Sequence, residues 1–199
     1  MSFDCINVSD ELVYCEKFRV LGFEFCVTCL QFSKPETFPM YFTKDKILSS
    51  KALKARIQAW RVHSERIVFT NGCFDILHPG HVDYLEKARK LGDRLVIGLN
   101  TDASVQKLKG IHRPIQHEQA RALLLAALEF VDGICFFDED TPYELILLLE
   151  PDVLVKGADY QPEEIVGYDL LKARGGEVKT IEFLEGYSTT SIIEKIKNT

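Results

Sequence analysis

Residues 70–91, TNGCFDILHPGHVDYLEKARKL, carry most of the information about the fold. An apolar run, residues 66–70, leads into a turn that contains glycine, and an amphipathic helical pattern follows. His78 and His81 enclose a Pro-Gly pair where the strand pattern passes into the helix pattern. The free N–H groups of a helix N-terminus attract anions, and Gly80 lets an anion approach the backbone closely. The stretch therefore predicts a phosphate site at a strand-to-helix turn.

Strand and helix patterns alternate from this stretch in both directions. Apolar runs typical of buried parallel strands predict strands at residues 66–70, 94–100, 133–137, 152–156 and 177–183. Helical periodicity predicts helices at residues 52–61, 80–91, 118–130, 141–149, 163–173 and 189–197. The alternation predicts an α/β, Rossmann-like doubly wound fold: a mainly parallel five-stranded sheet with helices on both faces.

Two helix starts have capping signals. Thr141-Pro-Tyr-Glu144 is typical of a capping box with proline at the first helical position. Ser188 or Thr189 is expected to cap the last helix.

Residues 1–39 differ from the rest of the chain. They hold four of the six cysteines and show no sustained period of 2 or 3.6. We interpret them as a poorly defined N-terminal extension. Our hypothesis is that the start site is placed too far upstream and that these residues are not native, and the intact mass of the native protein would test it. Residues 40–64 are expected to contain a lead-in helix, and residues 65–199 to form the main domain. Cys26 and Cys29 form half of a zinc motif, but a structural site needs four ligands, so apolar filler is the stronger alternative.

The bulk properties restrict the class of protein. A chain of 199 residues has room for one core of ordinary size. A net charge of −6 disfavours a nucleic-acid partner. We expect no membrane partner, because no segment is apolar over a membrane-spanning length and the N-terminus lacks the pattern of a signal peptide. Six cysteines in a chain of this size do not indicate a disulfide scaffold, and the expected compartment is the cytoplasm.

The histidine pair has two other interpretations. An isolated HxxH is most often a pair of helix-cap or surface histidines, and the spacing also occurs in metal sites. Pro79-Gly80 between the histidines indicates a turn rather than two ligands on one helix face. Residues 71–81 and 98–102 both follow strands, and ligands of doubly wound sheets bind at the carboxyl ends of strands. This context favours phosphate binding.

The motif GCFDILHPGH resembles the HxGH signature of the nucleotidylyltransferase superfamily. Further segments resemble the adenylyltransferase domain of ADP-heptose synthesis enzymes, in register from about residue 46 to the C-terminus: GLNTDASVQKLKG with RPI after it, DTPYELI, PDVLVKGADY and GYSTTSII. The resemblance implies an enzyme that transfers AMP from ATP to D-glycero-β-D-manno-heptose 1-phosphate and releases pyrophosphate, in the synthesis of cell-surface polysaccharide (the lipopolysaccharide core). It also implies Mg²⁺ held mainly by phosphates, and a homodimer. The related domain is often fused to a sugar kinase, so we expect a stand-alone form that acts with a separate heptose kinase.

Two other functions stay open. One is a cytidylyltransferase for glycerol 3-phosphate or a similar alcohol phosphate, but those relatives have an arginine that Phe183-Leu-Glu-Gly-Tyr-Ser-Thr lacks. The other is a non-catalytic nucleotide-binding protein. The chain also departs from the heptose family, because Tyr187 and Ser191 stand where the related GHSTTR pattern has histidine and arginine.

The nucleotide is expected to lie on the strand-to-helix turn and on two later segments. The turn supplies Thr70, Asn71, Gly72, Cys73, Phe74 and Gly80; the later segments supply Lys156, Gly157, Asp159, Ser188, Thr189 and Thr190. Hydroxyls at a helix start can donate to phosphates, although ordinary N-capping explains some of them equally well.

The catalytic residues are expected to be His78, His81 and Lys109. Resemblance to cytidylyltransferases implies a lysine on the transferred phosphate; Lys107 lies nearby, and a solvated basic loop is the alternative. Arg113 is expected to hold the sugar phosphate, since arginine suits bidentate phosphate contacts. Arg121 is the second choice, or a surface salt-bridging residue. Asp75 is expected to orient a neighbour, to ligate Mg²⁺ through water, or to stabilise its turn.

Overall fold

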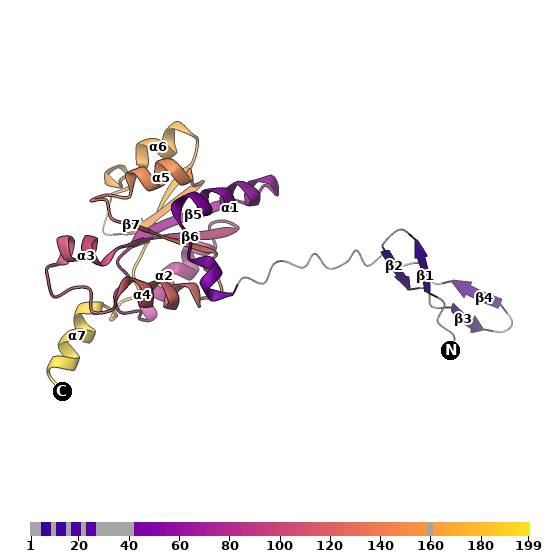
Figure 1. Cartoon of the computed structure of the whole chain (residues 1–199), viewed down its shortest axis with the longest axis horizontal. Coiled ribbons are helices and arrows are strands. Elements are labelled where there is room, and N and C mark those ends of the chain that lie inside the picture. Colours follow the sequence, from indigo (N-terminus) through magenta and orange to yellow (C-terminus); the bar gives the residue numbers. More distant parts are fainter. Residues whose placement is uncertain (1–4, 9–10, 15–16, 21–22, 27–41, 159–160) are drawn as a thin grey trace. The chain divides into compact units, whose positions relative to one another are not determined.

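The computed structural model describes residues 5–8, 11–14, 17–20, 23–26, 42–158 and 161–199. The chain divides into two compact units, Met1–Met40 and Tyr41–Thr199 (Figure 1). In the first unit, β1 (Cys5–Val8) pairs with β2 (Glu11–Tyr14), and β3 (Lys17–Val20) pairs with β4 (Phe23–Cys26); both pairs are antiparallel. Strands of four residues are too short to show a period of 2 in the sequence. The zinc hypothesis concerned Cys5, Cys15, Cys26 and Cys29, which lie outside the described side chains.

The second unit contains a five-stranded sheet in which every pairing is parallel. Its order is β7-β6-β5-β8-β9. The strands are β5 (Ile67–Gly72), β6 (Arg94–Asn100), β7 (Gly133–Phe137), β8 (Val153–Gly157) and β9 (Glu177–Ile181). The chain runs outward from β5 to β7 and then crosses back to β8, so the topological switch point lies between β5 and β8. This arrangement confirms the predicted doubly wound α/β fold.

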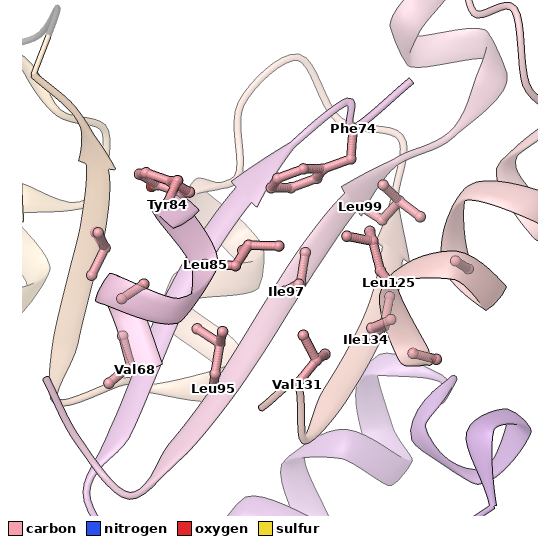
Figure 2. Packing of buried hydrophobic residues seen from close by; sticks show 14 of the residues in the cluster. Val68, Phe74, Tyr84, Leu85, Leu95, Ile97, Leu99, Leu125, Val131 and Ile134 are labelled. Carbon is pink, nitrogen blue, oxygen red and sulfur yellow. The ribbon is translucent and has the colours of Figure 1, made fainter. Parts of the chain in front are cut away.

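Helices cover both faces of the sheet, as predicted (Figure 1). One face packs against α2 (Pro79–Arg89) and α4 (Glu118–Ala126), through Leu85, Ala88 and Leu125 (Figure 2). The other packs against α1 (Ser50–Val62), α5 (Tyr143–Leu149) and α6 (Tyr168–Ala173). Successive strand residues point to opposite faces, and both faces of the central strands are buried, so β5, β6, β7 and β8 are mainly apolar. The edge strand β9 is only partly buried and carries polar side chains.

The segment before α1 covers the edge of β7. It contains the short 3₁₀ helix η1 (Thr43–Lys46), and Leu48 N donates to Ile134 O at 2.8 Å. Lys46 Nζ donates to Leu128 O just beyond α4, at 3.0 Å. A covered edge strand is protected from pairing with another chain. Among the described helices, none has the length and apolar character needed to cross a bilayer.

Three local predictions were wrong. Residues 102–109 were expected to be a loop, but they form the helix α3 (Asp102–Lys109). Its N-cap is Thr101, whose side chain accepts a hydrogen bond from Ser104 N. Thr141 does not cap α5, because Pro142 occupies the N-cap position without a side-chain hydrogen bond. The helix expected at residues 163–173 is split into η2 (Pro162–Glu164) and α6, because Gly167 has a φ of +93°.

Several helix ends also differ from the prediction. Helix α4 stops at Ala126 rather than at residue 130, because the chain turns there to enter β7. The last helix, α7 (Thr189–Lys197), has the predicted bounds, and its cap is Ser188.

Candidate active site

The histidine motif occupies the predicted turn between β5 and α2. His78 is the N-cap residue, with extended backbone angles, and Pro79 is the first helical residue. Proline suits this position because its fixed φ matches the helix and no N–H is lost from the helical ladder. His81 N donates to His78 O at 2.9 Å. The two imidazoles are therefore carried by one rigid helix start at the carboxyl end of the central strand.

The rings of the two histidines are stacked. Their centroids are 3.7 Å apart and their planes differ by 19°. Phe74 packs its ring against His81 at 5.2 Å in an edge-on geometry. Both Nδ1 atoms are buried and have no hydrogen-bond partner within the described part of the chain. Gly80 makes room for this arrangement, since a Cβ at residue 80 would lie 3.1 Å from His78 Nδ1 and 3.2 Å from Tyr187 Cβ.

Burial keeps the pair neutral. It lowers the pKa of His78 below its usual value. Burial, followed by the positive charges of His78 and Lys109, lowers the pKa of His81 to about 4, although a backbone hydrogen bond with Ile76 acts in the opposite direction. At neutral pH both rings are uncharged hydrogen-bonding groups, and the positive charge at the site comes from lysines.

A cavity of about 560 Å³ opens at the carboxyl ends of β5, β6, β7 and β8. Its volume is in the range of small-molecule sites. The residues that line it are Asn71, Gly72, Cys73, Phe74, Asp75, His81, Tyr84, Asn100, Leu108, Lys109, Phe137, Asp140, Thr141, Pro142, Lys156, Gly157, Glu164, Ile165, Val166, Phe183 and Thr189. His81, Lys109, Lys156 and Thr189, each expected to contact the nucleotide or the transferred phosphate, thus share one cavity.

The two expected lysines of α3 are separated by the helix. Lys109 lines the cavity and Lys107 does not. Each helical residue is rotated by about 100° from the previous one, so side chains two positions apart point in nearly opposite directions. Only one of the two lysines can therefore face the site. Lys156, at the end of β8, donates to Asn71 O at 3.4 Å and lies across the switch point from β5.

Asp75 and Arg113 form a buried ion pair. Arg113 Nε donates to Asp75 Oδ2 at 2.6 Å, and Asp75 Oδ1 accepts from the backbone N–H groups of Ile115 and Gln116. Burial opposes ionisation of Asp75, but these donors keep its pKa below the usual value. Asp75 therefore orients Arg113, and three of the roughly four acceptor positions of its carboxylate are occupied. Arg113 is not among the residues that line the cavity, and its role in holding the sugar phosphate stays a prediction.

Arg121 is fully buried and is not a surface residue. It donates to the carbonyl oxygens of Cys73, Asn100 and Gln116 and pairs with Asp102 Oδ1 at 2.7 Å. This side chain joins the turn after β5 to the end of β6 and to the segment before α4. Arg121 therefore stabilises the segments that carry cavity residues, but it is not itself among the residues that line the cavity.

Several other residues that were expected to contact the nucleotide make contacts within the protein, and their contact with a nucleotide stays a prediction. Thr70 is buried and shares a 2.8 Å hydrogen bond with Tyr84 Oη. Ser188 caps α7 by accepting from Ser191 N at 3.0 Å. Gly80, Thr190 and His78 are not among the residues that line the cavity, and the ring of His78 stacks on the ring of His81. Asp159 lies outside the described residues.

Helix α7 begins beside α2. Tyr187 immediately precedes the Ser188 cap, and its Cβ lies against Gly80. This contact brings Thr189 to the cavity that His81 lines. Ser191, which stands where the heptose family has arginine, donates to Ser188 O at 2.8 Å and so helps to close the cap.

The described residues contain no group of three or more His, Cys, Asp or Glu side chains that could hold a metal ion. These residues therefore present no cluster of side chains for a protein-built magnesium site, and Asp75 already accepts three hydrogen bonds.

Sequence reasoning missed cavity residues that come from distant segments. Asn100, which donates to Ser104 Oγ at 2.9 Å, ends a strand next to the motif, and its position there was a usable signal. Others were given no role in the cavity by the sequence; they are Leu108, Phe137, Asp140, Glu164, Ile165, Val166 and Phe183.

The chain is similar to several known proteins. Residues 69–195 match the cytidylyltransferase-like family. Bifunctional protein HldE of Wolinella succinogenes is 56% identical over 155 residues, which are 78% of this chain and 32% of that protein. Bifunctional protein HldE of Rhodopseudomonas palustris (strain HaA2) is 57% identical over 155 residues, with 77% and 32% covered. The chain thus spans about a third of the length of these curated relatives.

Solved structures give the same fold. The lipopolysaccharide core biosynthesis protein from Thermoplasma volcanium GSS1 is 29% identical, with a TM-score of 0.50; 62% of this chain and 99% of that chain are covered. Pantoate-beta-alanine ligase from Francisella tularensis, solved with Beta-gamma ATP and Beta-alanine, is 17% identical with a TM-score of 0.52 and coverage of 77% and 78%. At that identity the second likeness concerns the fold alone.

Proposed function

Because this chain belongs to the cytidylyltransferase-like family of nucleotidyltransferases, we propose that it transfers AMP from ATP to D-glycero-β-D-manno-heptose 1-phosphate. The products are ADP-heptose and pyrophosphate, for the synthesis of the lipopolysaccharide core. The observation that carries the proposal is the convergence of His81, Lys109, Lys156 and Thr189 on one cavity at the carboxyl end of the sheet. Two HldE proteins are more than 50% identical in sequence to this chain over most of its length, and this similarity favours the heptose substrate.

The reaction suits neutral histidines and charged lysines. A phosphate oxygen of the sugar 1-phosphate attacks the α-phosphorus of ATP, and the bond from that phosphorus to the oxygen bridging the α- and β-phosphates breaks. The attacking phosphate is ionised at neutral pH, so no general base is needed. The protein aligns the two anions and stabilises the charge on the transferred and leaving groups.

Each group has a role in this alignment. His81, with its lowered pKa, donates a hydrogen bond from a neutral ring without adding positive charge to the apo cavity. Lys109 approaches the phosphates from the end of α3, which follows β6, and Lys156 approaches them from β8; β6 and β8 lie on opposite sides of β5. Thr189, in the first turn of α7, adds a hydroxyl beside a helix N-terminus. His78 supports the ring of His81 from behind.

Magnesium enters this proposal as part of the substrate. ATP carries Mg²⁺ on its own phosphate oxygens, and Mg²⁺ is commonly held in this way with few protein ligands. We also propose a cytoplasmic enzyme, active as a homodimer, that uses sugar phosphate from a separate heptose kinase. The greater length of the bifunctional relatives fits a second activity fused to the same domain.

A cytidylyltransferase for an alcohol phosphate is the second candidate, favoured by the name of the matching family. Pyrophosphate release distinguishes the two, measured with ATP and with CTP, each with Mg²⁺ and a panel of sugar and alcohol phosphates. Release with ATP and heptose 1-phosphate supports the proposal. Release only with CTP and glycerol 3-phosphate supports the alternative, and binding of ATP without any release supports a non-catalytic nucleotide-binding protein.

A further inference from the structure

The cavity has two halves on either side of the central strand. Nucleotides bind doubly wound sheets at the switch point, which here lies between β5 and β8. Lys156 and Gly157, from the end of β8, line that half. The other half lies over β6 and β7, and its lining includes Lys109, Asp140 and Thr141. If ATP occupies the switch-point half, the second substrate has to occupy the half over β6 and β7.

The loop between β7 and α5 presents two polar side chains to that half. Thr141 does not cap α5, and the described residues give neither Asp140 nor Thr141 a side-chain hydrogen bond or ion pair. The loop is fixed on both sides of them. Asp138 accepts a hydrogen bond from Thr101 Oγ1, and Pro142 is buried. Asp140 and Thr141 therefore line the cavity on a held loop as exposed side chains whose polar groups have no partner among the described residues.

The chemistry of these groups selects their ligand. An ionised carboxylate only accepts hydrogen bonds and repels phosphate, so Asp140 does not suit the charged end of the acceptor. It suits hydroxyl groups, and the Thr141 hydroxyl can both donate and accept. Lys109 supplies positive charge to the same half of the cavity. This half of the cavity thus offers a positive charge at Lys109 and hydroxyl-binding groups at Asp140 and Thr141. It matches an acceptor that has an anionic end and a hydroxyl-rich body.

We propose that Asp140 and Thr141 bind the hydroxyls of the acceptor and make the site selective for polyhydroxylated sugar phosphates over hydroxyl-poor phosphate esters. This inference rests on the proposed function, because it assigns the body of the acceptor to the half of the cavity that ATP leaves open.

The test compares the affinities of two acceptors, measured by titration calorimetry on the full chain: heptose 1-phosphate and methyl phosphate. Asp140→Ala and Thr141→Val should each weaken binding of heptose 1-phosphate, with Asp140→Ala weakening it by about ten- to hundredfold, the range for a lost hydrogen bond to a charged group. Binding of methyl phosphate and ATP should change less than twofold. Glu144→Ala is the matched control, since it removes a carboxylate from the exposed first turn of α5 outside the cavity lining.

The outcomes separate this inference from the proposed function. Unchanged affinity for heptose 1-phosphate in Asp140→Ala overturns the inference, even if AMP transfer is intact. Binding of heptose 1-phosphate that depends on Asp140, without AMP transfer by the wild-type protein, upholds the inference and refutes the function. A wild-type protein that binds methyl phosphate as tightly as heptose 1-phosphate overturns the inference too.

Discussion

His78 and His81 stack their imidazole rings 3.7 Å apart at the start of α2, and neither Nδ1 atom has a hydrogen-bond partner among the described residues. Two charged imidazoliums would repel each other at this distance, so the stack is an arrangement of neutral rings. The lowered pKa values of both rings agree with this geometry. In the proposed reaction His81 therefore acts on phosphate by hydrogen bonding from a neutral ring, and the positive charge is supplied by Lys109 and Lys156.

His81→Ala should lower kcat by on the order of 10²–10³, by analogy with loss of one donor to a developing negative charge. The fold should survive, because His81 lines a cavity rather than the core. Steady-state pyrophosphate release and circular dichroism measure the two effects. Turnover within a factor of three of wild type would remove His81 from the mechanism.

The stability of the protein should depend on His81 as the pH falls. The folded-state pKa of about 4 is below the ordinary value near 6.5, so the unfolded chain binds more protons between these values. Stability from the neutral ring is complete above about pH 6.5 and is lost as the pH falls toward 4, with a slope of up to about 1.4 kcal/mol per pH unit. Urea unfolding of wild type and His81→Asn at several pH values tests this, and parallel curves for the two proteins would contradict it.

Gly80→Ala should lower turnover with little change in stability. The added Cβ would lie 3.1 Å from His78 Nδ1 and 3.2 Å from Tyr187 Cβ, so the histidine ring or the start of α7 has to move. Alanine favours the helix over glycine by about 1 kcal/mol, which offsets part of the crowding. Kinetics and thermal unfolding of the variant give both quantities. Wild-type kinetics would show that the spacing of the two helix starts does not matter.

Arg121→Met should destabilise the protein by about 3–5 kcal/mol, the range for breaking a buried ion pair from one side. The substitution leaves Asp102 without its 2.7 Å partner and removes a donor from three carbonyl groups. Lys107→Met, on the exposed surface of α3, is the control and should change stability by less than about 0.5 kcal/mol. A loss of stability below about 1 kcal/mol for Arg121→Met, measured by urea unfolding, would refute the role of Arg121 in joining the three segments.

The fold was predictable because its signals are local. Apolar runs and helical periods placed all five strands of the parallel sheet, and His78-Pro-Gly-His81 marked the strand-to-helix turn that the structure contains. Helix α3 was missed although Thr101 was available as a cap, because the segment was interpreted as a loop. That error also hid the reason why Lys109 faces the cavity and Lys107 does not.

The rest of the site depends on contacts between distant residues. Arg121 lies 48 positions from Cys73, to which it donates, and Asp75 lies 38 positions from Arg113. Neither separation leaves a period or motif in one sequence. Asp140 and Thr141 begin the quoted segment DTPYELI, but their place in the cavity depends on the pairing of β7 with β6, which the segment itself does not reveal. The helix-capping signal at Thr141 was misleading, since proline took the cap position itself.

The most direct test follows labelled oxygen from the acceptor into the product. Heptose 1-phosphate with ¹⁸O in its phosphate is incubated with ATP and Mg²⁺, and the products are identified by mass spectrometry. Attack on the α-phosphorus predicts ADP-heptose that carries the label and pyrophosphate that carries none. Label in the pyrophosphate, AMP as a released product, or no ADP-heptose at all would contradict the proposed reaction.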